Sequence, residues 1–566
     1  MNTIQNLFEQ ARLAEAAYAD FANYPTTAKA LEAEGMGTAQ ATAFVAQWTV
    51  VNQLPDTPSG FSGRLFQNKA GEYSLALRGT AGATDLMADA GDILTDGIAL
   101  DQIVDLYNYW QSLTHTGVYQ AVQLNTLTAE TVALRAAYGI SAAAGLAYEA
   151  VLRANGNIID NPSHTVRTIQ PVDSTQLSDA SLQIGTGKLP ATAVVNVDGH
   201  SLGGHLAMAF SRLFQSATNS VVAVNGAGFN FGNTNGDALF AALGGAPGFD
   251  AGRITNVVGS AAMNMVSQDW LYLQQPAGRN MIFTESYLPG SNTTFGHGSG
   301  QMTDSLALYA LFAQIDPALN TGTLGTITAI LEASSNIAAN SLEAALAAVG
   351  KIYGKTYIGI ETNRDDFYTN LYNLKPAITG TGTVVAIGGD VSGQARTDIA
   401  YRYALAELNP FAITGNAALY DQHNQNGELD RYDPATGTGN LTDLYLKDRA
   451  AMLSWKIKYD SGARDDDGLA DDFLRIGDKP YSANWDTRNA QDDWKFIDVR
   501  NSVTFTIDGV GSDLHTIAFG NTLSDDGHPH RDFAYMLSNP PFGVEWKKVE
   551  KEIRKEYESM GYQGRF

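Results

Sequence analysis

The sequence contains no cysteine. This absence excludes disulfide bonds, thiolate zinc sites and a cysteine nucleophile. Basic residues are also few, because 36 Lys and Arg stand against 60 Asp and Glu, and the formal net charge is −24. Since affinity for a phosphate backbone comes from Lys and Arg, we expect no nucleic-acid-binding surface over most of the chain.

Long apolar runs are missing as well, because no window reaches the roughly 18 uninterrupted apolar residues of a membrane helix. The first ten residues have neither the basic leader nor the apolar stretch of a cleaved Sec signal. What is present is a globular composition, with 44% hydrophobic and 17% charged residues in a chain of 566. Such a chain is long enough for several domains with sizeable cores.

Short β-rich runs alternate with helix-length segments in the middle of the sequence. This alternation predicts a parallel sheet with crossover helices, and therefore an α/β fold class. The runs are Ala193–Val197, Val221–Val224, Ile254–Val258 and Asn280–Thr284, with an earlier one at Tyr73–Leu77.

Three parts of the chain are expected around this sheet. Residues 1–315 would form the α/β domain, with an amphipathic helix over 6–35 and a mostly helical insert at about 92–155. The insert is either a lid over an apolar site or a structural layer of helices. Residues 316–515 would form an accessory α+β region, and 516–566 a short unrelated fragment.

The motif Gly199-His-Ser-Leu-Gly203 directly follows one of the predicted strands, and apolar residues at helical spacing follow it. A strand, a tight turn and a helix are the context in which G-x-S-x-G marks a nucleophile. We therefore predict Ser201 as the nucleophile, with the backbone N–H of Leu202 facing a developing oxyanion. A chance match is the alternative in a chain with 56 glycines, and the flanking strand and helix weigh against it.

A serine nucleophile needs a histidine to take its proton. His205 lies on the helix just after the motif, too close in sequence to reach back over the sheet. His297 is the predicted base, because it stands in the glycine-rich loop Phe295–Gly300, after the last β-rich run and before a helix. The alternative is that His297 is simply a histidine of a flexible loop.

The acid of a triad is expected after the penultimate strand, where Asp269 is the one carboxylate between Val258 and Asn280. A capping or surface role for Asp269 stays open, with Glu285 as the substitute acid. The second oxyanion donor is expected after an early strand, and the backbone N–H of Thr80 occupies that place. A simple turn at the end of the strand is the alternative there.

These motifs resemble the lipase class 3 pattern, carried by Tyr18, Leu77-Arg-Gly-Thr80 with Asp85, and Gly199-His-Ser-Leu-Gly-Gly204. The longer stretches Gly199–Phe214 and Phe295–Tyr309 resemble large bacterial RTX-type lipases and polyurethanase-like esterases, over about residues 1–515. The resemblance implies an α/β-hydrolase fold that hydrolyses acylglycerol esters at a lipid–water interface, with no cofactor for catalysis. It also implies secretion by a type I system and calcium that assists folding.

The sequence departs from that family near its end, where the Gly-Gly-x-Gly-x-Asp repeats and the terminal secretion signal are not found. A cytoplasmic location therefore stays open beside secretion. Two acidic loops, Asp421–Asp433 and Asp465–Asp472, are candidate calcium sites, since calcium prefers clustered oxygens. Neither follows EF-hand spacing, and solvated acidic loops are the alternative interpretation.

The last part of the chain resembles the modification subunit of type I restriction systems. The resemblance is carried by Gly520–Asp526 and by Asn539, Pro540, Pro541 and Phe542. In such adenine N6-methylases the Asn539 amide and the Pro540 carbonyl would hold the target amino group, and Phe542 would stack on a flipped base.

No convincing S-adenosylmethionine loop precedes this motif, so we interpret the tail as a fragment that is inert as a methylase. The hypotheses are thus a serine esterase or lipase, an adenine-specific DNA methyltransferase, and a catalytically inactive scaffold. The sequence gives no indication of the oligomeric state.

Overall fold

The computed structural model describes residues 3–80, 96–260 apart from 161 and 233, 273–285, 297–334, 341–357 and 363–450 apart from 444 and 448, together with a few single positions between 93 and 480. The chain forms two compact units. The first consists of residues 1–331 and 338–384, and the second of residues 332–337 and 385–566.

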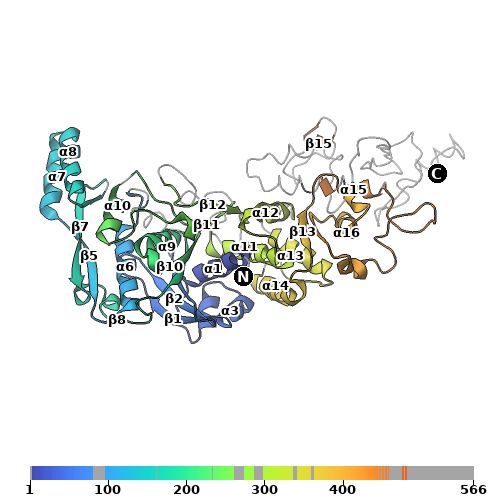
Figure 1. The fold of residues 1–566 in the computed structure, drawn as a ribbon, viewed down its shortest axis with the longest axis horizontal. Helices are drawn as coiled ribbons and strands as arrows, with labels where there is room; N and C mark the ends of the chain where they lie inside the picture. The colour runs from blue at the N-terminus through green and yellow to red at the C-terminus, as the bar shows by residue number, and fades with distance from the viewer. Residues whose placement is uncertain are drawn as a thin grey trace, which may run out of the picture. The chain divides into compact units, whose positions relative to one another are not determined.

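A seven-stranded sheet forms the centre of the first unit (Figure 1). From β3 onward the neighbouring strands run parallel, whereas β1, β2 and β3 are antiparallel. In sheet order the strands are β1 (Trp48–Leu54), β2 (Gly63–Asn68), β3 (Tyr73–Leu77), β9 (Val195–His200), β10 (Thr218–Val224), β11 (Ile254–Gly259) and β12 (Arg279–Ile282). The predicted α/β class is therefore confirmed, and the arrangement is α/β-hydrolase-like; the β1–β2 hairpin was not expected.

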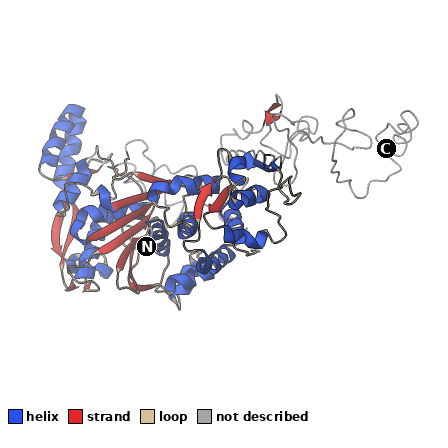
Figure 2. Cartoon of the chain, turned by 45° about the vertical axis from the view of Figure 1, so that its right-hand side comes forward, coloured by secondary structure: helices blue, strands red, loops and turns tan. Residues whose placement is uncertain are grey.

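Helices cover both faces of this sheet (Figure 2). Successive strand residues point to opposite faces, so Leu75 and Leu77 join one core cluster while Ala76 joins another. The first cluster includes residues of α6 (Leu100–Thr114) and α9 (Leu202–Leu213), and the second residues of α1 (Thr3–Ala16).

The N-terminal segment differs from the single helix expected over 6–35. Helix α1 ends at Ala16, and α2 (Thr27–Ala33) starts anew after Thr26, whose side chain accepts from the Lys29 N–H. Helix α3 (Thr38–Val45) follows. A capping threonine favours a new helix start, which the spacing of apolar residues does not reveal.

The insert between β3 and β9 is not simply helical. After α6 it contains β4 (Thr116–Gly117), β5 (Gln120–Thr126), α7 (Thr128–Ile140), α8 (Ala142–Ala154), β6 (Ile158–Asp160), β7 (Thr165–Asp173) and β8 (Gly185–Thr186). Strands β5, β7 and β6 form an antiparallel sheet, and β4 pairs with β8.

Most residues of α6 are buried in the main core, so this helix is a structural layer. We call the helical hairpin Thr128–Ala154 the arm; its two helices lie at the left of Figure 1.

Helix α11 (Ser299–Ile315) ends at the boundary expected near residue 315, but the first unit continues beyond it. The helices that follow are α12 (Leu324–Glu332), α13 (Ser341–Ile352) and α14 (Arg364–Ile378), and the unit ends within β13 (Thr383–Ala386). Arg364 of α14 pairs with Glu15 of α1 at 3.0 Å and with Asp304 of α11 at 2.7 Å. The Asp365 carboxylate accepts from the Ala39 N–H of α3 at 2.8 Å. Side chains after residue 315 thus bind the N-terminal helices.

The second unit contains α15 (Val391–Ala395), α16 (Ile399–Glu407), β14 (Phe411–Thr414), a 3₁₀ helix at Ala417–His423, and the short strands β15 (Arg475–Ile476) and β16 (Lys479–Pro480). Its described core includes Leu405, Ile413 and Tyr420. The fragment expected over 516–566 lies outside the described residues. Across the described ranges of both units, no helix has the length and apolarity to cross a membrane.

Candidate active site

Ser201 occupies a strained turn between β9 and α9. Its φ of 57° and ψ of −122° are unusual for a residue with a side chain, and such backbone conformations cost about 1–3 kcal/mol. Its N–H donates to the Val224 carbonyl of the neighbouring strand at 2.9 Å, which holds the turn in place. Strain that is retained at one serine at the carboxyl edge of a parallel sheet is typical of a nucleophile elbow.

The two glycines of the motif are required by close backbone approach. A Cβ on Gly199 would lie 2.0 Å from the Gly203 carbonyl oxygen, and a Cβ on Gly203 would lie 2.0 Å from the Leu77 carbonyl oxygen. Any side chain at either position would push the strand, the turn and the helix apart. The spacing of the motif thus has a steric cause in this fold.

The structure brings the predicted nucleophile and base together. Nε2 of His297 lies 3.0 Å from Oγ of Ser201, although the residues are far apart in sequence. Burial, together with the neighbouring His200, lowers the pKa of His297 to about 3. The imidazole is therefore neutral near pH 7, and its Nε2 can accept the serine proton.

His200 holds the backbone of His297, a role that sequence reasoning missed. Its Nε2 lies 2.6 Å from the His297 carbonyl oxygen, which can only accept, so Nε2 carries the proton and donates. Nδ1 then accepts from the Tyr18 hydroxyl at 2.8 Å. The Asn225 side chain donates to the same carbonyl at 3.1 Å. Tyr18 stood out only in the motif resemblance, and no sequence signal pointed to Asn225.

The loop after β3 lies directly beside the nucleophile. A Cβ on Gly79 would be 3.2 Å from Cβ of Ser201 and 2.5 Å from the Tyr18 hydroxyl. That hydroxyl accepts from the Gly79 backbone N–H, so Tyr18 links this loop to His200. Thr80 is the next residue of the loop, and Leu202 is the first residue of α9, where backbone N–H groups have no intrahelical acceptor. Both predicted oxyanion donors thus adjoin the nucleophile.

The predicted acid, Asp269, lies outside the described residues. Its substitute, Glu285, is buried. Oε1 of Glu285 accepts from the Leu342 N–H at the start of α13 at 3.0 Å, where a negative charge is favourable. This contact gives Glu285 a capping role at α13.

His205 occupies a separate, fully buried environment. Its Nε2 accepts from the Ala99 N–H at 3.3 Å, and its Nδ1 donates to the Gly228 carbonyl at 3.1 Å. The ring stacks on Phe229, with centroids 4.0 Å apart. Burial lowers the pKa of His205 to about 4. Both ring nitrogens contact backbone groups, which gives this residue a structural role.

Within the part of the chain that the structure describes, no group of three or more His, Asp or Glu side chains is placed to hold a metal ion. In the loop Asp421–Asp433, carboxylates bind local groups: Asp430 accepts from Asn424, and Asp433 accepts from the Ala435 N–H. The second acidic loop, Asp465–Asp472, lies outside the described residues, as does the methylase-like motif Asn539–Phe542.

A polar cavity of about 620 Å³ lies elsewhere in the first unit, between α6, β5 and two loops. Asp105 on its wall accepts from Thr57 at 2.6 Å and from Ser59 at 2.7 Å. Neither Ser201 nor His297 lines it, so it is distinct from the site at the carboxyl edge of the sheet.

No protein-family model matches the chain, and no curated protein matches it. It is similar to several solved structures. Lipase II from Rhizopus niveus is 13% identical, covering 49% of this chain and 80% of that one, with a TM-score of 0.24. Lip2 lipase from Yarrowia lipolytica is 18% identical, covering 52% and 84%, with a TM-score of 0.26. A triacylglycerol lipase from Penicillium expansum is 14% identical, covering 53% and 87%, with a TM-score of 0.22.

Proposed function

We propose that the chain is a serine carboxylic ester hydrolase of the lipase type. The observation that carries the proposal is the 3.0 Å contact between Oγ of Ser201 and Nε2 of His297 at a strained turn. A hydroxyl becomes an effective nucleophile when a neutral imidazole within hydrogen-bond distance takes its proton. A scaffold without catalytic function would have no need of this strain.

Acylation follows from that geometry. Oγ of Ser201 attacks the ester carbonyl as its proton passes to Nε2 of His297, and the carbonyl oxygen becomes an oxyanion. The N–H groups of Leu202 and Thr80 donate to this oxyanion, and each such donor stabilises the transition state by about 3 kcal/mol. When the tetrahedral intermediate collapses, the imidazolium gives its proton to the leaving alcohol, and the acyl group stays on Ser201.

Deacylation repeats these steps with water as the nucleophile. His297 takes the proton of water as the new C–O bond forms, and the proton returns to Ser201 when the carboxylic acid leaves. Asp269 would accept from Nδ1 of His297 and stabilise the imidazolium. No step requires a metal or another cofactor.

Lipid esters are the proposed substrate class. The support is the resemblance of Leu77–Thr80 and Gly199–Gly204 to the lipase class 3 pattern, together with a net charge of −24, which disfavours polyanionic substrates. The alternative, DNA methyl transfer, finds no support among the described residues.

Turnover of p-nitrophenyl butyrate and p-nitrophenyl palmitate tests the proposal. The unmodified chain should hydrolyse both, and Ser201→Ala should not. A fluorophosphonate gives a second readout, because Oγ attacks phosphorus and fluoride leaves. Peptide mapping should find the phosphonyl group on Ser201, whereas Ser220→Ala, a matched control on β10, should keep both turnover and labelling. Full turnover by Ser201→Ala would reject the assignment.

A further inference from the structure

The arm has an unusual surface for a helical hairpin in contact with water. Of its exposed residues, all except Thr128, Arg135 and Ser141 are Ala, Gly, Val, Leu or Ile. The large ones are strongly exposed: Val132 at 62%, Ile140 at 82%, Leu146 at 60% and Val151 at 54%. A solvated helix normally carries polar residues on its outer face, and a helix that is apolar all round is normally buried.

Each arm helix has two apolar stripes. The inner one forms a small core of Leu134 and Leu152 with Tyr138 and Tyr148. The outer one follows the helical spacing i, i+3, i+4, i+7 and consists of Ala129, Val132, Ala133, Ala136 and Ile140 on α7, and of Ala143, Leu146, Ala147, Ala150 and Val151 on α8. The inner stripe explains why the hairpin folds, whereas the outer one has no such role.

Charge is distributed unevenly along the arm. From Ala136 to Tyr148, around its tip, the chain has no charged residue. Nearer the base, Arg153 forms an ion pair with Glu149 at 2.8 Å, and Arg135 donates to the Ser163 carbonyl at 3.0 Å. The apolar surface thus covers both helices and the turn between them, a shape suited to insertion into an apolar medium.

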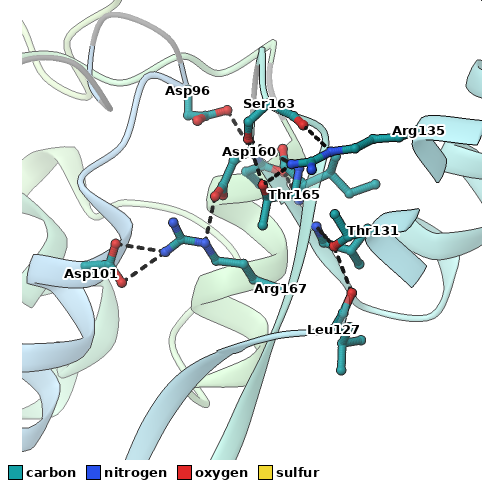
Figure 3. Close-up of polar contacts among 12 residues, drawn as sticks. Asp96, Asp101, Leu127, Thr131, Arg135, Asp160, Ser163, Thr165 and Arg167 are labelled. Atoms are coloured by element: carbon teal, nitrogen blue, oxygen red, sulfur yellow. Dashed lines mark hydrogen bonds and ion pairs between the residues drawn. The ribbon is translucent and has the colours of Figure 1, made fainter. Parts of the chain in front are cut away.

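The base of the arm is fixed to the first unit by polar contacts (Figure 3). Arg167 of β7 binds Asp101 of α6 at 2.8 Å and Asp160 of β6 at 2.6 Å. Asn235 of α10 (Thr234–Ala242) accepts from the Ile159 N–H at 3.1 Å and from Arg153. These contacts of charged and buried side chains fix the orientation of the hairpin relative to the rest of the first unit.

The arm projects from the catalytic edge of the sheet. Helix α10, to which Arg153 and Ile159 bind, begins shortly after the carboxyl end of β10. Ser201 follows the carboxyl end of the parallel neighbour β9. Parallel strands end at the same edge of a sheet, so the arm and the nucleophile share one side of the first unit.

We infer that the tip of the arm, Ala136–Tyr148 with the adjoining outer stripes, docks into the neutral surface of an aggregated lipid ester and brings Ser201 to it. This inference rests on the proposed function. An uncharged, apolar tip on a protein with a net charge of −24 fits a neutral or zwitterionic surface better than an anionic one. A second copy of the chain would cover one face of the hairpin, whereas the apolar surface extends around its end.

Vesicle flotation with the Ser201→Ala chain tests docking without hydrolysis. The chain should bind vesicles of phosphatidylcholine, with little effect of added salt, because apolar burial is not screened. Ile140→Asp combined with Leu146→Asp should lower the partition coefficient about 100-fold or more. Val194→Asp is the matched control, since Val194 is 51% exposed and precedes β9 at the opposite edge of the sheet. Equal binding by the double variant, or equal loss in the control, would overturn the inference.

A site-specific label locates the contact. The chain has no cysteine, so Ile140→Cys or Val194→Cys introduces one unique thiol for an environment-sensitive fluorophore. Nitroxide lipids in the vesicles should quench the label at position 140 and not at 194. A dimer in analytical ultracentrifugation that Ile140→Asp dissociates, without vesicle binding, would assign the surface to a second copy instead.

Different outcomes would overturn the proposed esterase activity and the proposed docking surface. Turnover of soluble p-nitrophenyl butyrate by the unmodified chain, without vesicle binding, would overturn the docking surface and leave the esterase. Vesicle binding without turnover of any ester would support the docking surface and reject the esterase.

Discussion

His205 is buried and His297 is half-buried, and desolvation lowers the pKa of both, to about 4 and about 3. They differ in what their rings contact. His205 binds the Ala99 N–H and the Gly228 carbonyl, whereas His297 presents Nε2 to a hydroxyl on a strained residue. A lowered pKa therefore does not separate a structural histidine from a catalytic one. The contact of the ring nitrogen does.

Loss of the reacting pair should give the largest effect. We expect Ser201→Ala and His297→Gln each to lower kcat/KM at least about 10⁴-fold, because nucleophile and base act as a unit. His205→Gln should change kcat/KM far less. Steady-state kinetics with p-nitrophenyl butyrate provide the measurement, and equal losses at His205 and His297 would remove the distinction between them.

A carboxylate that accepts from Nδ1 of His297 would distinguish this histidine further from His205. Asp269→Asn should lower kcat about 10³-fold to 10⁴-fold, since the imidazolium loses its counter-charge. An anion favours the protonated ring, so its removal should move the acid limb of the kcat/KM profile to lower pH. Glu285→Gln should leave that limb in place. A shift with Glu285→Gln and none with Asp269→Asn would exchange the two assignments.

The loop beside Ser201 offers the next test. A Cβ at Gly79 meets the His200 carbonyl and the Tyr18 hydroxyl, both at 2.5 Å. Gly79→Ala should displace the Thr80 donor and lower kcat about 10²-fold to 10³-fold, with a smaller change in KM. Gly248→Ala, where a Cβ meets nothing within 4 Å, is the control. Unchanged kcat in Gly79→Ala would count against this oxyanion site.

The hydroxyl that links the loop to His200 should matter less. Tyr18→Phe removes the partner of His200 Nδ1 and of the Gly79 N–H, and we expect kcat to fall about tenfold, the scale of one lost positioning hydrogen bond. Tyr109→Phe is the matched control, because its hydroxyl donates to Asn52 at 2.8 Å, away from the site. If both variants lose similar stability and kcat falls only in Tyr18→Phe, Tyr18 has a positioning role. Equal losses of kcat in Tyr18→Phe and Tyr109→Phe would contradict that role.

The last test concerns stability rather than catalysis. The pKa of His205 falls from 6.5 to about 4 on folding, so below pH 6.5 the unfolded chain binds a proton that the folded chain does not. His205 therefore destabilises the fold as pH falls from 6.5 toward 4, by about 1.4 kcal/mol per pH unit. His205→Gln should weaken the pH dependence of urea unfolding in that window. His115→Gln, at an exposed histidine, is the control, and identical curves for the two variants would refute the assignment.

Patterns local in sequence predicted a large part of this site. The strand, turn and helix around Ser201 follow from apolar periodicity and two glycines, and the loop position of His297 follows from the order of the strands. The pairing of Tyr18 with His200, and of Asn225 with the His297 carbonyl, depends on segments that meet only in the folded chain. No periodicity encodes such contacts.

The fold shows the same limit. Apolar runs predicted the parallel strands, but the hairpin β1–β2 alternates too weakly to be recognised, and the strands within the insert are hidden by the helical spacing of its neighbours. The extension of the first unit beyond residue 315 depends on Arg364, whose partners Glu15 and Asp304 are remote in sequence.

That last feature bears on how the protein is made. During synthesis the chain emerges from its amino end. Glu15 therefore cannot pair with Arg364, nor the Ala39 N–H donate to Asp365, until most of the first unit has left the ribosome. A recombinant chain that ends at residue 315 would leave the buried Glu15 carboxylate without the Arg364 guanidinium. Breaking a buried ion pair in this way lowers the stability of the fold by about 3–5 kcal/mol. A recombinant catalytic fragment should therefore extend to about residue 384, the end of the first unit.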